Sequence, residues 1–223
     1  MDGNGRWAQE RGLPRVEGHR EGANAVRTVV RACRKKGLEA LTLFAFSSQN
    51  WQRPSEEVAA LMQLLHEYAI NEREEILGNN IRFRCVGDVD ALPAPVLRAL
   101  RDLERDSAHN SGMALSLALS YGGREDILQA TRRLVAQAAD GRLQPEDVDS
   151  SCFTDALWTR ELPGDVDLLV RTSGEMRVSN FLLWQIAYAE LVFVDSFWPD
   201  FGQDQLDRVL NTYSGRDRRF GAL

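Results

Sequence analysis

Cysteine is scarce in this chain of 223 residues, which has only Cys33, Cys85 and Cys152 and no Cys-x-x-Cys pair. The wide spacing argues against a disulfide framework and against a zinc site, and it is typical of proteins kept in a reducing cytosol. Cys33 and Cys85 lie within apolar patterns, so we interpret them as small core residues.

Several other features are missing. No run approaches about 18 consecutive apolar residues and no signal peptide is recognisable, so the sequence predicts no transmembrane helix and no secretory leader. The net charge of −6 argues against free nucleic acid as a partner. Neither a Gly-x-Gly-x-x-Gly nor a Walker pattern is present, which argues against a generic nucleotide-binding enzyme.

Short apolar runs typical of buried strands alternate with amphipathic stretches. The expected strands are residues 41–46, 81–86, 113–119, 166–170 and 190–194. The stretch from Val26 to Cys33 has helical spacing, and a short helix is expected over 181–187. The alternation predicts an α/β fold, with a largely parallel central sheet and helices on both faces, in a single domain spanning residues 1–223.

The first seven residues, Met-Asp-Gly-Asn-Gly-Arg-Trp, carry the strongest local signal. Gly3 and Gly5 permit positive φ and bring bare N–H groups close to an anion, which is how phosphates are cradled at a helix start. Asp2 beside a phosphate calls for a divalent cation between them, and Mg²⁺ is bound in that way. The alternative is a surface turn capped by Asp2.

No strand-like run precedes this motif, although a loop of this kind normally leaves the end of a strand. Either an upstream first strand is missing from the sequence, or the cradle is less firmly anchored than its pattern suggests.

Polar loops follow four of the expected strand ends, and they hold more arginine than lysine. Arginine binds phosphate oxygens in a bidentate manner, whereas lysine supplies a point charge. The arginines of these loops and of the N-terminal segment therefore predict a site for two diphosphates. Those in question are Arg6, Arg15, Arg53, Arg171 and Arg177.

The motifs DGNGRWA, GHREGA, FAFSSQNWQRP, YGGRED, RTSGEMRVSNFLLWQIAYAEL and WPDF occur in this order along nearly the whole chain. They resemble the successive motifs of the cis-prenyltransferase family, most closely those of bacterial undecaprenyl diphosphate synthases. The resemblance implies Mg²⁺-dependent condensation of isopentenyl diphosphate, repeated on an allylic primer such as farnesyl diphosphate. The product would be a long Z-polyprenyl diphosphate such as undecaprenyl diphosphate, a lipid carrier precursor for cell-wall synthesis.

The resemblance also implies a homodimer with an apolar tunnel, located in the cytoplasm at the inner face of the membrane to which the product is delivered. Arg218, Arg219 and Gly221 would reach the partner subunit's site. Leu61, Leu65, Met113 and Leu115 are the candidates for the tunnel lining. Met113 would be either the floor of the tunnel or an ordinary core residue.

Site roles carry over from the motifs. Asp2 and Asn50 would be catalytic, Asn50 in proton removal, and Asp2 and Glu190 would bind the metal. The allylic diphosphate would be held by Gly3, Asn4, Gly5, Arg6, Arg15, His19 and Arg53. Trp7 and Trp51 would flank the substrate. The reacting centre would include Ser47, Ser48, Gln49 and Asn50. The isopentenyl diphosphate would be held by Arg171, Arg177, Val178 and Ser179.

Two residues depart from the family pattern. Gln49 stands where glutamate is usual, which changes the charge at the reacting centre, and Met176 stands where many members have histidine or glutamine. A rival hypothesis is a non-catalytic subunit of a heteromeric prenyltransferase, but such partners lack the acid and arginines of the first motif. The helical trans-prenyltransferases are disfavoured because no DDxxD motif is present.

Overall fold

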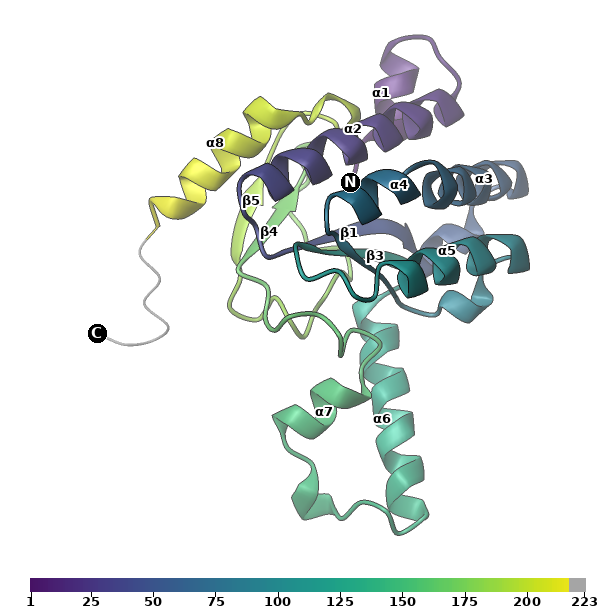
Figure 1. Ribbon diagram of the computed structural model, residues 1–223, viewed down its shortest axis with the longest axis vertical. Coiled ribbons are helices and arrows are strands. Elements are labelled where there is room, and N and C mark those ends of the chain that lie inside the picture. The colour runs from purple at the N-terminus through teal and green to yellow at the C-terminus, as the bar shows by residue number, and fades with distance from the viewer. Residues whose placement is uncertain (217–223) are drawn as a thin grey trace.

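A computed structural model describes residues 1–216 and contains five parallel strands (Figure 1). The first ladder has the order β1-β3-β2, with β1 spanning Ala40–Ser47, β3 Ala114–Tyr121 and β2 Arg82–Val86. The second ladder pairs β4 (Leu168–Arg171) with β5 (Glu190–Phe193). The expected parallel direction is confirmed, but the strands form two ladders rather than one continuous sheet.

Four helices cover one face of the larger ladder. They are α2 (Arg15–Lys35), α3 (Ser55–Asn71), α4 (Arg73–Gly78) and α5 (Ala94–Asp106). All eight residues of β3 are buried, as expected for a strand paired on both edges.

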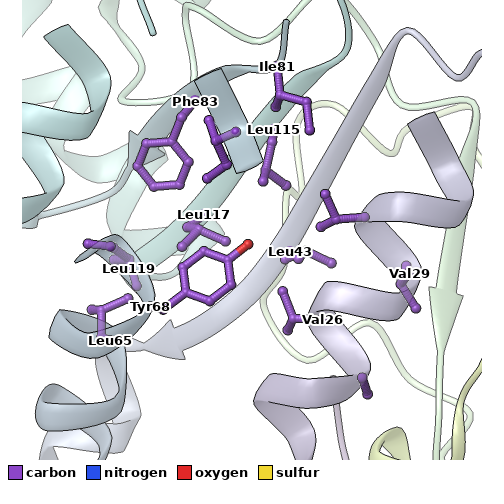
Figure 2. Close-up of a cluster of buried hydrophobic side chains, with 14 of the residues drawn as sticks. Val26, Val29, Leu43, Leu65, Tyr68, Ile81, Phe83, Leu115, Leu117 and Leu119 are labelled. Carbon is purple, nitrogen blue, oxygen red and sulfur yellow. The ribbon is translucent and has the colours of Figure 1, made fainter. Parts of the chain in front are cut away.

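The main core lies between these helices and the ladder (Figure 2). Leu115, Leu117 and Leu119 alternate along β3 and meet Tyr68 of α3 and Val26 of α2 in this cluster. Burial of each such leucine contributes roughly 1.5–3 kcal/mol to stability. On the opposite face of the larger ladder lies a second hydrophobic cluster, which includes Phe44, Tyr121, Phe181 and Leu182.

The remaining helices are α1 (Asn4–Glu10), α6 (Gly123–Ala139), α7 (Ser150–Ala156) and α8 (Gln203–Ser214). Short 3-10 turns span Ser48–Gln52, Val89–Ala91, Pro145–Asp147 and Trp198–Asp200. Helices α6 and α7 project from the body and share a small core of their own (Figure 1). None of the helices in residues 1–216 combines the length and apolar character that crossing a bilayer requires.

Close packing fixes the N-terminal segment on α2. A Cβ at Gly18 would lie 1.9 Å from the carbonyl oxygen of Asn4, and one at Gly22 would lie 2.3 Å from the Asn4 side-chain oxygen. Both glycines are therefore needed for the approach of α1. Gly37, with φ +75°, follows α2 in the left-handed conformation that ends many helices, as the sequence predicts.

The helix expected over residues 181–187 is wrong, because this segment consists of turns. Ser179, Asn180 and Leu182 all have positive φ, which a right-handed helix excludes. The segment is held by long-range bonds instead, including the donation of the Val166 N–H to the Gln185 carbonyl over 2.9 Å. The motif at Arg218, Arg219 and Gly221 lies outside the described residues.

Candidate functional site

A cavity of about 810 Å³ lies between β1 and β4 and opens among polar residues at the carboxyl ends of both strands. Asp2, Asn50, Arg171 and Ser179 all line this end, so residues distant in the sequence are brought together here. Ligand sites in parallel α/β folds lie at this edge of the sheet.

Asp2 is the acid of this cluster. Its carboxylate accepts hydrogen bonds from Arg171 Nη2 over 2.8 Å and from the Gly3 N–H over 2.7 Å, and Arg6 lies 3.8 Å away. Burial opposes ionisation, yet these hydrogen bonds outweigh it, so the pKa of Asp2 lies below its ordinary value. Asp2 is therefore an anion held between two arginines.

The turn after Asp2 requires glycine. Gly3 has φ +97°, and a Cβ there would lie 2.5 Å from the Phe197 ring. The turn leads directly into α1, whose first turn has no side-chain cap. A Cβ at Gly5 would meet the Arg15 guanidinium at 2.7 Å. Gly3 therefore has the positive φ that the sequence predicts, whereas Gly5 lies within α1 and does not.

Arg171 is the central cation of the β4 end. Besides Asp2, it donates to the Ser179 hydroxyl and to the Arg177 carbonyl, and its side chain is only 12% exposed. Ser179 adopts φ +46° to receive it. Val178 lines the same cavity, whereas the Arg177 side chain turns out to solvent and pairs with Glu175.

Arg6 joins this group from α1. Its Nη2 donates to Ser173 over 2.7 Å and its Nη1 lies 3.2 Å from Glu175. Glu175 thus pairs with two arginines, Arg6 and Arg177.

Two arginines and one histidine surround a carboxylate that the sequence did not single out. Glu57 Oε1 accepts from Arg53 over 2.8 Å and lies 3.3 Å from His19 Nε2, while Arg15 Nε lies 3.4 Å from Oε2. Burial favours the neutral carboxyl, but Arg53 and Arg15 outweigh it and lower the pKa of Glu57. Burial also lowers the pKa of His19, and the hydrogen bond to Glu57 offsets this decrease only in part. The sequence signal for this contact was the spacing of Arg53 and Glu57, which are four positions apart, with Glu57 in the first turn of α3.

The loop after β1 places its polar residues between these two groups. Asn50 lines both the large cavity and a smaller one beside His19 and Arg53, and its Oδ1 accepts from the Ser47 N–H over 3.0 Å. Ser48 bonds to the Tyr121 carbonyl at 3.4 Å. The Trp51 indole donates to Ser120 over 2.9 Å and packs edge-on against Phe46.

The smaller cavity, about 160 Å³, lies between α2 and α3 and is largely apolar. Leu61 and Leu65 line it, as the sequence predicts, and β3 contributes Leu117 and Leu119. Met113 and Leu115 are buried in the main core and are not among its lining residues. Met113 therefore does not border this cavity, which stops nearer the carboxyl end of β3.

Three residues of the predicted motifs, Trp7, Met176 and Glu190, lie outside these two groups. The Trp7 indole donates to Asp200 over 2.7 Å and stacks under Arg11, on the side of α1 towards residues 198–200. Met176 is 79% exposed.

Glu190 begins β5 opposite Leu168, about 10 Å of strand before the level of Arg171, and pairs with Arg216. Within one chain it does not join Asp2. Among residues 1–216, no three acidic, histidine or cysteine side chains form a metal cage.

Gln49 has a partner that explains its departure from glutamate. Its amide donates to Glu125 over 3.2 Å, and Asn180 donates to the other oxygen of that carboxylate over 2.8 Å. A glutamate at position 49 would face Glu125 with like charge. Sequence reasoning missed Glu125, because this contact joins the first turn of α6 to a 3-10 turn 76 residues earlier.

We expect Gln49→Glu to destabilise the protein and Glu125→Gln to relieve that loss in the double variant. The contact is exposed, so the coupling energy in a double-mutant cycle should be about 0.5–1 kcal/mol. Urea unfolding of the four proteins measures it. Additive effects of the two substitutions would contradict the pairing.

The chain matches known proteins over almost its whole length. The model of a family described as putative undecaprenyl diphosphate synthase matches residues 1–221. An isoprenyl transferase of Geobacter sulfurreducens is 49% identical over 99% of this chain and 89% of its own length. A ditrans,polycis-undecaprenyl-diphosphate synthase of Xanthomonas axonopodis pv. citri, named as specific for (2E,6E)-farnesyl diphosphate, is 49% identical over 99% of this chain and 86% of its own length.

The fold has a solved counterpart as well. The crystal structure of lavandulyl diphosphate synthase from Lavandula x intermedia, in complex with dimethylallyl diphosphate, has a TM-score of 0.96 and 37% identity. The match covers 99% of this chain and 95% of that one. On the joint strength of the sequence matches, the fold and the arrangement of cations around Asp2, the chain belongs to the undecaprenyl diphosphate synthase family of prenyltransferases.

Proposed function

We propose that this protein is an Mg²⁺-dependent cis-prenyltransferase that adds isopentenyl diphosphate repeatedly to farnesyl diphosphate and so makes a long Z-polyprenyl diphosphate such as undecaprenyl diphosphate. The observation that carries the proposal is the position of Asn50 between two groups of cations. Arg171 and Arg6 lie towards Asp2, whereas His19, Arg53 and Arg15 surround Glu57.

The two cation groups suit two diphosphates. The group around Glu57 borders the apolar cavity between α2 and α3, so the allylic primer would bind there with its hydrocarbon tail against Leu61 and Leu65. Each buried CH₂ contributes roughly 0.8 kcal/mol to holding that tail out of water. The isopentenyl diphosphate would bind at Arg171, Arg177 and Ser179.

Asp2 fits a magnesium site of the kind that proteins share with substrates. Mg²⁺ is commonly bound by one or two carboxylates together with phosphate oxygens and water, and Asp2 is an ionised carboxylate at the diphosphate end of the cavity. When bound, the metal would neutralise charge that develops on the departing diphosphate.

The chain's own residues would serve the reaction as follows. The allylic carbon–oxygen bond breaks while the terminal methylene of isopentenyl diphosphate forms a carbon–carbon bond to that carbon, and pyrophosphate leaves. Arginines and backbone N–H groups stabilise the leaving charge in a preorganised site, and the apolar walls exclude water. One proton leaves the former isopentenyl unit, towards Asn50 Oδ1 or a pyrophosphate oxygen, since a neutral amide is a weak base.

A homodimer would account for Glu190. This residue can serve a metal at Asp2 only from a second copy, since the two lie at different ends of the β4–β5 ladder in one chain. We place the enzyme in the cytoplasm, peripheral to the inner face of the membrane that receives its product.

The direct test is to incubate the protein with farnesyl diphosphate, labelled isopentenyl diphosphate and Mg²⁺, and to size the labelled products. Asp2→Ala should keep the fold and lower turnover by about 10²-fold or more, because it removes the metal anchor. Asp204→Ala on α8 is the matched control. Near-wild-type turnover of Asp2→Ala at saturating Mg²⁺ would refute the assignment.

Diphosphate binding should be coupled to protonation of His19. Its pKa is lowered in the free protein, so near neutral pH it is uncharged, and a nearby diphosphate raises that pKa. Proton uptake on binding, and tighter binding as pH falls from about 7.5 to about 6, are therefore expected. Calorimetry with pyrophosphate in buffers of different ionisation enthalpy measures the uptake.

The exposed His109 provides the control for this experiment. His19→Gln should reduce the uptake, leaving only the protonation change of the ligand itself, while His109→Gln should not. Equal uptake in both variants would exclude His19 as the proton acceptor.

Product length should depend on the lining of the α2–α3 cavity. Leu61→Trp fills this space and should shorten the products. Met113→Ala should lower the free energy of unfolding by roughly 2–5 kcal/mol without altering product length, because Met113 belongs to the core rather than to the lining. Chromatography of the products and urea unfolding distinguish the two effects. Longer products from Met113→Ala would restore this residue as the floor.

A further inference from the structure

The loop that follows β4 contains residues in unusual backbone conformations. Ser179, Asn180 and Leu182 have φ of +46°, +63° and +45°, in the left-handed region that residues other than glycine rarely adopt. Such conformations persist only where the surrounding structure holds them. The contacts that hold this loop therefore determine where the Ser179 hydroxyl lies relative to Arg171, which donates a hydrogen bond to it.

Asn180 ties this loop to the first turn of α6. Its carbonyl accepts from the Gly123 N–H over 2.7 Å, and its side-chain Oδ1 accepts from the Arg124 N–H over 2.8 Å. Its Nδ2 donates to Glu125 Oε2 over 2.8 Å. The first two donors are backbone groups at a helix start, so Glu125 is the partner whose side chain completes the attachment.

The two glycines before Arg124 make this close approach possible. A Cβ at Gly122 would lie 2.1 Å from Glu125 Oε2 and 2.6 Å from Asn180 Nδ2. A Cβ at Gly123 would lie 2.7 Å from Leu183 Cγ, in the segment that follows Asn180. The glycine pair therefore lets the loop after β4 pack directly on the start of α6.

The other oxygen of Glu125 contacts the turn that carries Asn50. Gln49 Nε2 donates to Glu125 Oε1 over 3.2 Å. Gln49, Asn50 and Asn180 all line the large cavity. Glu125 therefore bridges the loop after β1 and the loop after β4, with one carboxylate oxygen for each.

We propose that Glu125 is a positioning residue for isopentenyl diphosphate, an inference that rests on the proposed function. Glu125 acts through Asn180, which holds the loop so that Ser179 and Arg171 meet the diphosphate in a fixed geometry. Gln49 holds the carboxylate in the orientation that Asn180 requires.

Stabilisation of α6 is the simpler role for Glu125, because an acid in the first turn of a helix interacts favourably with the helix dipole. The neighbouring Asp126 faces elsewhere: it is buried and accepts from the Trp158 N–H over 2.7 Å and from the Thr159 hydroxyl over 3.0 Å. A pure helix-start effect would lower stability without changing the affinity for a ligand, so the two roles predict different results.

The experiment compares Glu125→Ala with the conservative Glu125→Gln. The alanine variant should raise the KM for isopentenyl diphosphate about tenfold with little change in kcat, because the diphosphate partners are no longer held in place. Glu125→Gln should stay near the unmodified protein, since an amide can still accept from Asn180 while Gln49 turns its own amide to suit. Asp204→Ala removes an acid from the first turn of α8 and should leave this KM unchanged.

Amide exchange in the free protein measures the loop itself. Residues 178–183 should exchange about tenfold faster in Glu125→Ala, but not in Glu125→Gln or Asp204→Ala. Asn180→Gly keeps the positive φ and removes the side chain, so it should reproduce the effects of Glu125→Ala. In the double variant the two substitutions should not add, because both remove the same contact.

An unchanged KM and unchanged loop exchange in Glu125→Ala would overturn the proposal. An equal loss of affinity in Glu125→Gln would also overturn it, because charge rather than hydrogen bonding would then be responsible. Failure of the unmodified protein to bind isopentenyl diphosphate would refute the proposed function itself, and equilibrium binding without a primer distinguishes that result from equal binding by all variants.

Discussion

The hydrogen bonds between Asp2 and the residues that follow β4 underlie the site. Arg171 and Thr172 hold the carboxylate and backbone of a residue that lies 169 and 170 positions earlier in the sequence. Gly3 then turns the chain into α1, and Gly18 and Gly22 let that helix settle on α2. Without this contact, neither the cradle nor Arg6 would face the carboxyl ends of the strands.

Carboxylates keep the cations of the site in place. Glu57 brings together three basic residues, Glu175 brings together two arginines, and Glu125 joins two amides. Like charges at such spacing repel one another unless an anion lies between them. These carboxylates therefore allow several basic side chains to lie close together in one part of the fold.

The two cavities differ in the chemistry of their walls. The cavity between α2 and α3 is enclosed largely by side chains, which suits a hydrocarbon. The larger cavity is lined by the outer strands of the two ladders, β1 and β4, and by polar residues at the ends of both strands. Asn50 and Met1 line both spaces, so the two cavities meet near the carboxyl end of β1.

The sequence by itself determined the strands, most helices, the parallel α/β class and the glycine turn at Asp2, because periodicity, apolar runs and glycine act over a few residues. Tertiary structure decided what depends on distant partners. It divided the strands into two ladders, replaced the helix expected over 181–187 with turns, and left Leu128 and Val135 of α6 exposed because that helix projects from the body. The roles of the carboxylates Glu57 and Glu125 also became visible only in the tertiary structure, since they depend on the basic residues and amides that folding places around them.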